Sequence, residues 1–158
     1  MRLFAESGYY RTSIQDIADE ANISKGAFYL YFDSKETFLI DSIEYFHTKL
    51  TTKLTYIKEK ELSPKDTLAE QINLLTEYIY NNRNFIIMMF REDISIGEKA
   101  KELFERLNQD NIHWLKNNIE TIFQVSSHHL QDLMIHMDGL MKGYYQWIVL
   151  GNLTVDKK

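Results

Sequence analysis

The side chains best suited to binding a polyanion are concentrated between Thr12 and Glu36. Thr12 and Ser24 each precede a short helical pattern, where a hydroxyl oxygen can accept from the free N–H groups of a helix start. Gln15, three residues after Thr12, completes a capping-box pattern. Capped helix starts also offer backbone N–H groups to phosphate oxygens, and Lys25 and Lys35 bracket the second pattern with positive charge. The chemistry predicted for this segment is phosphate binding.

No other set of residues has the spacing of a catalytic or metal centre. The five histidines are dispersed, and His129 and His136 lie seven residues apart without a carboxylate pair at metal-ligand spacing. The sequence has no Gly-rich phosphate loop and no nucleophile motif. It also has no cysteine, and hence neither disulfides nor thiolate chemistry. We therefore expect no enzymatic activity, no cofactor and no metal.

Two short helical patterns joined by a tight turn would position the phosphate-binding groups. Ala18 is small enough to let the second helix cross close over the first. Asn22 stands where the turn needs a left-handed residue, which Asn tolerates better than most residue types. The inward residues of the second helix are expected to be Phe28 and either Tyr31 or Phe32. This is the geometry by which a helix-turn-helix presents its second helix to the DNA major groove.

The order of residues goes further than a generic helix-turn-helix. The segment LFAESGYYRTSIQDIADEANISKGAFYLYFDSKETF resembles the N-terminal domain of the TetR/AcrR family of bacterial transcriptional regulators. The matching pieces are Phe4-Ala5, Gly8-Tyr9, Thr12-Ser13-Ile14, Ile17-Ala18, Ser24-Lys25-Gly26-Ala27-Phe28-Tyr29, Tyr31-Phe32 and Ser34-Lys35-Glu36. The match covers about the first 45 residues, and Asn22 departs from the glycine usual in the turn.

The resemblance implies a homodimer that places two recognition helices in successive major grooves of a palindromic double-stranded operator. Thr12 and Ser13 are expected to contact phosphate, and Tyr29 and Lys35 resemble the family's backbone-binding tyrosine and lysine. Lys25 can donate to guanine, whereas the apolar residues that face outward offer contact to a thymine methyl group. The candidate DNA-binding residues are Thr12, Ser13, Ser24, Lys25, Gly26, Ala27, Tyr29, Leu30 and Lys35.

Composition and charge set limits on this interpretation. The 158 residues suffice for a small head fused to a helical body. No apolar run reaches the length of a membrane span and no secretory signal is evident, so a cytoplasmic protein is expected. Residues 1–50 carry five Lys or Arg against eight acids, a net charge of −3. The head is therefore not basic as a whole, but phosphate binding requires positive potential only locally.

The predicted fold class is all-α, because one Pro and six Gly leave few helix breakers. A three-helix DNA-binding head, residues 1–47, is joined by a long fourth helix to an effector-binding and dimerisation body, residues 48–158. The first helix should end at Gly8, and the others cover about 13–20, 25–31, 33–60, 64–81, 85–93, 97–124 and 128–149. The N-terminus is expected to be trimmed, and at the C-terminus either the chain is trimmed or the protein lacks the family's last helix.

Aromatic and Met side chains crowd the body, and such side chains suit a plastic apolar pocket. Ordinary core packing is the alternative for each of them. The candidate pocket residues are Tyr78, Phe85, Met88, Met89, Trp114, Tyr144 and Tyr145. They predict a small apolar or amphipathic effector.

The last helix carries small residues at a regular interval. Gly139 and Gly143 recur four residues apart and Trp147 follows at the same spacing. A glycine inside a soluble helix lowers its stability by about 1 kcal/mol relative to alanine, and a close helix crossing is the usual compensation. The crossing is either internal packing or, as the resemblance implies, a dimer interface.

Together these features predict a ligand-responsive transcriptional regulator, most often a repressor in this family, that an effector releases from its operator. The alternative is a helix-turn-helix regulator whose helical body binds a protein partner. A ligand-sized apolar cavity in the body would favour the first function. A filled core with an exposed apolar groove would favour the second.

Overall fold

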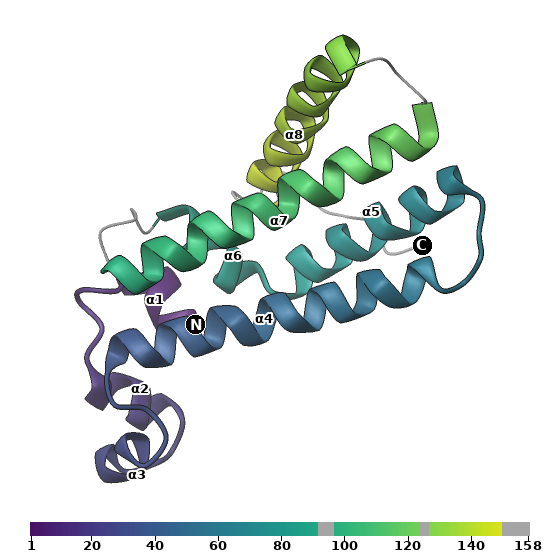
Figure 1. Cartoon of the computed structure of the whole chain (residues 1–158). Coiled ribbons are helices and arrows are strands. Elements are labelled where there is room, and N and C mark those ends of the chain that lie inside the picture. Colours follow the sequence, from purple (N-terminus) through teal and green to yellow (C-terminus); the bar gives the residue numbers. More distant parts are fainter. Residues whose placement is uncertain (92–96, 124–126, 150–158) are drawn as a thin grey trace. The chain divides into compact units, whose positions relative to one another are not determined.

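The computed structural model describes residues 1–91, 97–123 and 127–149, and in these ranges it contains only helices (Figure 1). The helices are α1 (Arg2–Ser7), α2 (Ile14–Glu20), α3 (Lys25–Tyr29), α4 (Lys35–Lys58), α5 (Pro64–Asn81), α6 (Arg83–Arg91), α7 (Glu98–Phe123) and α8 (Ser127–Val149). The predicted all-α class is confirmed. None of the described helices is both long and apolar enough to cross a membrane.

Helix boundaries follow the signals in the sequence. Gly8 has a φ of 84°, a left-handed conformation that glycine adopts without strain, and it ends α1 with its N–H bonded to the Phe4 carbonyl. Pro64 is the first residue of α5, where its missing N–H costs no hydrogen bond. Ser63 stands before it and accepts from the Asp66 N–H at 3.3 Å. Both boundaries lie where the sequence predicted them.

The chain divides into two compact units. One comprises residues 1–49 with 82–105, and the other comprises residues 50–81 with 106–158. The long helices α4 and α7 each contribute one part to either unit. The unit that contains the head is thus larger than the predicted residues 1–47, because α6 and the start of α7 belong to it.

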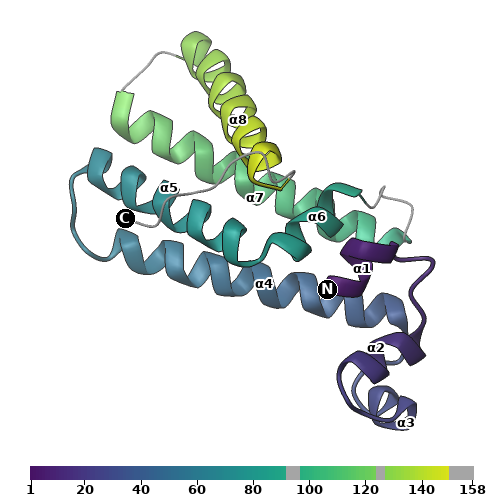
Figure 2. The ribbon, with the colours of Figure 1, turned by 180° about the vertical axis from the view of Figure 1, so that it is seen from behind.

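Aromatic rings form much of the core of the first unit. The ring of Phe38 lies 6.1 Å from that of Phe4, 5.7 Å from that of Phe28 and 5.0 Å from that of Phe32. Phe4 and Phe28 are buried to 1% exposure. These rings join α1, α3 and α4, while α1 also packs against α6 and α2 lies beside α3 (Figures 1 and 2). The head therefore owes its shape to aromatic packing of its helices.

The second unit buries aliphatic side chains along α5 and α7. Leu75 and Ile79 of α5 and Leu115 and Ile119 of α7 are all buried. Their spacing of four residues places each pair on one face of its helix. Helix α5 also packs against α8. Gln71, on the same face of α5, is fully buried as well.

Candidate nucleic-acid interface

Helix α2 is capped by Ser13, one residue later than expected. The Ser13 hydroxyl accepts from the Asp16 N–H at 3.1 Å, and the Asp16 carboxylate accepts from the Ser13 N–H at 2.7 Å. These reciprocal bonds form a capping box. The predicted box of Thr12 and Gln15 was wrong, because the Thr12 side chain is directed into the head instead.

Thr12 is a buried residue, only 2% exposed. Its hydroxyl donates to the Gly8 carbonyl at 2.8 Å, and its own carbonyl accepts from the Lys35 ammonium at 2.8 Å. The same ammonium donates to the Tyr9 carbonyl at 2.7 Å and lies 4.3 Å from the centre of the Tyr9 ring. The structure thus gives Thr12 and Lys35 a part in holding the head together. Of Thr12 and Ser13, the two predicted phosphate contacts at the start of α2, only Ser13 is exposed.

The turn between α2 and α3 has the predicted form. Asn22 adopts a φ of 54°, the left-handed conformation expected for it. The Ile23 N–H donates to the carbonyl of Ala18 at 3.0 Å, and Ala18 is completely buried. A larger residue than Ala18 would keep the two helices apart. The prediction of a tight helix-turn-helix is confirmed.

Helix α3 turns one face to the core and the other to solvent. Ser24 caps it by accepting from the Ala27 N–H at 3.0 Å, as predicted. Phe28 is buried at the centre, and of the two candidates beyond it Phe32 packs against Phe28 with a ring separation of 5.4 Å. Tyr31 is instead 79% exposed.

The solvent face of α3 contains most of the predicted DNA-contacting residues. Lys25, Gly26 and Tyr29 are exposed, and Leu30, which follows the helix, is 82% exposed. Ala27 is half-buried. Tyr29, Leu30 and Tyr31 are consecutive and are 48%, 82% and 79% exposed, and large apolar side chains clustered on a surface indicate a contact site. The structure therefore brings these five residues together on one surface.

Gly26 lies in the first turn of α3 without a packing requirement for glycine. A Cβ atom added there would meet only the Ser24 Oγ, at 3.7 Å, which is ordinary van der Waals contact. Its φ is not in the left-handed region. Neither packing nor backbone conformation explains the glycine, whereas close approach of a DNA backbone or base edge would.

Ion pairing reduces the positive charge that the head offers. Arg2 donates to both carboxylate oxygens of Glu20, with Nε–Oε1 at 3.0 Å and Nη2–Oε2 at 2.5 Å. These hydrogen bonds raise the pKa of Arg2 and lower that of Glu20. Bonds from the Ser13 hydroxyl and then its N–H likewise lower the pKa of Asp16. Lys25, by contrast, is an exposed cation at the start of α3.

Sequence reasoning missed two exposed tyrosines of the head. Tyr10 is 65% exposed in the loop before α2, and Tyr31 follows α3. The exposure of both tyrosines could have been predicted from the sequence, because each is next to an aromatic residue of the core. Tyr9 is buried, and Phe32 packs against Phe28. Phenolic hydroxyls suit phosphate oxygens, and these two residues extend the candidate surface.

The predicted effector pocket is distributed over both units. Phe85 and Met88 belong to the first unit and are buried, whereas Tyr78, Trp114 and Tyr144 belong to the second. Tyr78 is buried and Tyr144 is 40% exposed. The side chains of Met89 and Tyr145 lie outside the described part of the structure. This pocket remains a prediction.

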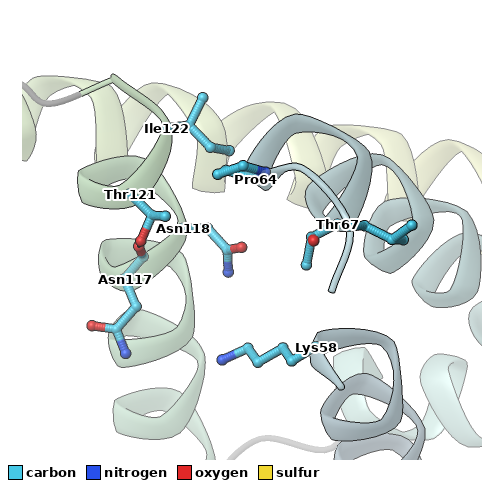
Figure 3. Close-up of a pocket in the computed structure, with 8 residues that line it drawn as sticks. Lys58, Pro64, Thr67, Asn117, Asn118, Thr121 and Ile122 are labelled. Carbon is cyan, nitrogen blue, oxygen red and sulfur yellow. The ribbon is translucent and has the colours of Figure 1, made fainter. Parts of the chain in front are cut away.

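A cavity of about 290 Å³ lies within the second unit (Figure 3). Its described lining comes from the end of α4, the start of α5, the connection between them and the last turns of α7. The lining residues are Lys58, Leu62, Pro64, Thr67, Asn117, Asn118, Thr121 and Ile122. None of them belongs to the predicted pocket, and the lining is mixed rather than apolar.

A polar residue within an apolar stripe was the available signal for this cavity. Asn118 lies between Leu115 and Ile122 on the apolar stripe of α7 and lines the cavity, whereas Gln71, at a similar position on α5, is not among the lining residues. Such positions require a hydrogen-bond partner or a ligand. The sequence prediction instead placed the pocket among the aromatic and Met residues of the body.

The glycines of α8 face open space within the protomer. A Cβ added at Gly139 or Gly143 would have no protein atom within 4 Å among the described residues. Trp147 is 54% exposed and Leu140 is 74% exposed. The close crossing expected at these glycines is thus not made by the described part of the same chain.

A tight turn, two capped helices, a buried inner face and an exposed outer face on α3 define a DNA-binding helix-turn-helix protein. Comparison with known proteins agrees. Residues 1–41 match the model for bacterial regulatory proteins of the tetR family. The chain is 31% identical to the uncharacterized HTH-type transcriptional regulator YuxN of Bacillus subtilis. The alignment extends over 157 residues and covers 98% of this chain and 54% of that protein.

One further relative points to the same family, and one solved structure shows the same fold. The HTH-type transcriptional regulator QacR of Staphylococcus aureus is 32% identical over 106 residues, which are 64% of this chain and 56% of that protein. A TetR-family regulator from Bordetella parapertussis superimposes with a TM-score of 0.76 at 23% identity, covering 92% of this chain and 77% of that one. The chain belongs to the TetR family of helix-turn-helix transcriptional regulators, a family of regulators and not of enzymes.

The chain spans about half the length of the curated relatives that it matches, 54% of one and 56% of another. Their shared family accounts for the DNA-binding head and for the TetR-like helical fold.

Proposed function

We propose that this regulator is a homodimeric repressor that a small apolar or amphipathic effector releases from a palindromic operator. Residues 1–47 bind DNA in this proposal, and residues 48–158 bind the effector and form the dimer. Effector binding would favour a state in which the two recognition helices no longer match the half-site spacing, so that operator affinity falls. The exposed outer face of α3 is the observation that carries the proposal.

On this face, Lys25 and Gly26 would approach base edges and Leu30 would contact a thymine methyl group. Lys25 is the one cation among these residues, and bidentate donation to guanine is the strongest base contact that it can make. Ser13 and Tyr29 would donate to phosphates on either side of the groove. Both are exposed, which supports this division of roles.

The exposed residues of α8 support the homodimer. Ile135, Leu140, Tyr144 and Trp147 are between 40% and 74% exposed. At 100° per residue these four side chains span one half of the surface of α8, and Gly143 lies near the centre of that half. An apolar helix face with glycines at its centre suits close packing against the same helix of a second protomer.

The cavity of the second unit supports the effector. Its volume of about 290 Å³ is just below the range of small-molecule sites, which begins at about 300 Å³. Its mixed lining suits an amphipathic molecule better than a purely apolar one. A protein partner would not require a pocket of this kind.

Selection of bound duplexes from a random-sequence library with the purified protein tests the proposal. We expect an inverted repeat with half-sites about one helical turn apart. The variant Leu30→Glu, which places a carboxylate on the exposed face of α3 and leaves the core untouched, should recover none. Recovery of a single unrepeated half-site would argue against a dimer on DNA, and recovery of no preferred sequence would overturn the proposal.

A further inference from the structure

The cavity in the second unit has a cation at its rim and no acid among its described lining residues. Lys58, in the last turn of α4, is the charged residue of the lining. It forms no ion pair with any residue that the structure describes. A lysine in the last turn of a helix complements the partial negative charge there. That preference does not explain why its side chain extends toward the cavity.

The polar groups of the cavity converge (Figure 3). The Lys58 ammonium, the Asn118 amide and the Thr67 hydroxyl point into the same space from α4, α7 and α5. One N–H of Asn118 donates to the Trp114 carbonyl at 2.8 Å, so its second N–H remains for another acceptor. An ammonium, an amide N–H and a hydroxyl are all donors, and together they match a carboxylate.

Unpartnered polar atoms lie one helical turn away from two members of this group. Gln71 lies one turn further along α5 than Thr67, and Trp114 lies one turn back along α7 from Asn118, on the same helix faces. Both side-chain atoms of Gln71 and the Nε1 of Trp114 are buried without a hydrogen-bond partner in the described protein. Buried polar groups of this kind are rare and call for a partner. Neither residue is among the described lining residues, so they are polar neighbours of the cavity along α5 and α7 and not part of its surface.

We propose that the effector of this regulator is a small carboxylic acid whose carboxylate binds Lys58, assisted by Thr67 and Asn118. Its apolar part lies against Leu62, Pro64 and Ile122 of the same lining. This inference rests on the proposed function, because it names the chemical class of the effector. It also identifies a site for that effector that the aromatic residues of the body did not indicate.

Calorimetry with matched pairs of probes tests the charge requirement. Octanoate is compared with 1-octanol, and 1-naphthoate with 1-naphthalenemethanol, so that each pair differs in the carboxylate alone. At least one acid should bind about tenfold more tightly than its alcohol, which corresponds to about 1.4 kcal/mol. Failure of both acids to bind, or equal affinity within both pairs, would overturn the proposal.

Matched variants of α4 locate the carboxylate. Lys58→Met should abolish the preference for the acid, and Lys58→Arg should retain it. Lys53→Met removes an exposed cation from the same helix outside the cavity lining and should leave the preference unchanged. Thermal melts establish that all three variants are folded. Equal loss in Lys53→Met and Lys58→Met would show that the preference reflects net charge and would overturn the site.

Operator release separates the two proposals. Each probe is added to the complex of the protein with its selected duplex. An acid that binds through Lys58 and releases the DNA supports both the site and its regulatory role. Binding through Lys58 without release keeps the carboxylate site but removes its role as the effector site. Release by a ligand that binds equally well to Lys58→Met overturns the site and leaves the proposed function intact.

Discussion

The ammonium of Lys35 lies 2.8 Å from the carbonyl oxygen of Thr12. Since Lys35 is the first residue of α4 and Thr12 directly precedes the cap of α2, this bond joins the start of the long helix to the start of the helix-turn-helix. A second bond to the Tyr9 carbonyl, at 2.7 Å, ties the same ammonium to the loop after α1. Lys35 is therefore a positioning residue for Ser13 and the N-terminus of α2.

Replacement of Lys35 by alanine should lower both the stability of the protein and its affinity for DNA. Loss of charge-assisted hydrogen bonds to two carbonyls should cost about 1.5–3 kcal/mol, measured by thermal or denaturant unfolding. Affinity should fall on every DNA sequence, with an unchanged salt slope. Lys25→Ala is the control: it should weaken binding to the selected operator by about 1–3 kcal/mol, through loss of the guanine contact, without changing the melting point. A salt slope reduced by about 0.9 in Lys35→Ala would establish the phosphate contact that the family resemblance implies.

Replacement of Ser13 by alanine should raise the pKa of Asp16. The Ser13 hydroxyl is the largest cause of the lowered pKa of this carboxyl. Because the folded-state pKa is depressed, the stabilisation is present above the unfolded-state pKa and is lost as the pH falls through the folded-state value. Titration of the carboxyl resonance by NMR measures the shift. Ser24→Ala, which removes the cap of α3, should leave the titration of Asp16 unchanged.

Local signals in the sequence were sufficient for the helices and the turn. The positive φ of Asn22, the cap at Ser24 and the start of α5 at Pro64 each depend on neighbouring residues, and all three were predicted. The cap of α2 was placed one residue too early. Thr12 and Ser13 can both cap a helix, and Thr12 is withdrawn from this role by its contact with Gly8 inside the head.

Functional positions that depend on long-range packing were not available from the sequence. The bonds from Lys35 to Tyr9 and Thr12 span more than twenty residues, and no helical period relates these positions. The cavity likewise combines residues from α4, α5 and α7. Asn118, a polar residue within the apolar stripe of α7, is the lining residue that carried a signal of it.

Replacement of Gly26 by alanine should stabilise the head and weaken operator binding. The added Cβ meets no protein atom closer than 3.7 Å, and alanine favours the helix by up to about 1 kcal/mol. On DNA the methyl group would hold α3 away from the groove, at a cost on the order of 1–3 kcal/mol, or roughly tenfold or more in affinity. Denaturant unfolding and operator titration measure the two effects. An unchanged operator affinity would place Gly26 outside the interface.

The double variant Gly139→Ala, Gly143→Ala should strengthen α8 and weaken the dimer. Neither new methyl group meets a described atom of the protomer, so each should add about 1 kcal/mol to helix stability. Across a close helix crossing the same methyl groups would separate the two backbones. Sedimentation at several concentrations measures the association. If the parent protein is a monomer, α8 does not mediate a homodimer, and its exposed apolar face is expected to contact a different protein.

Replacement of Gln71 by leucine should raise the melting point. Both polar atoms of this buried side chain lack a partner in the described protein, and each such atom costs about 1–3 kcal/mol that an apolar side chain of similar size avoids. Asn118→Leu is the contrasting variant. It removes an amide that donates to the Trp114 carbonyl at 2.8 Å, and it should lower the melting point. A lower melting point in Gln71→Leu would show that the Gln71 amide is hydrogen-bonded in solution, which requires a bound water or ligand beside it.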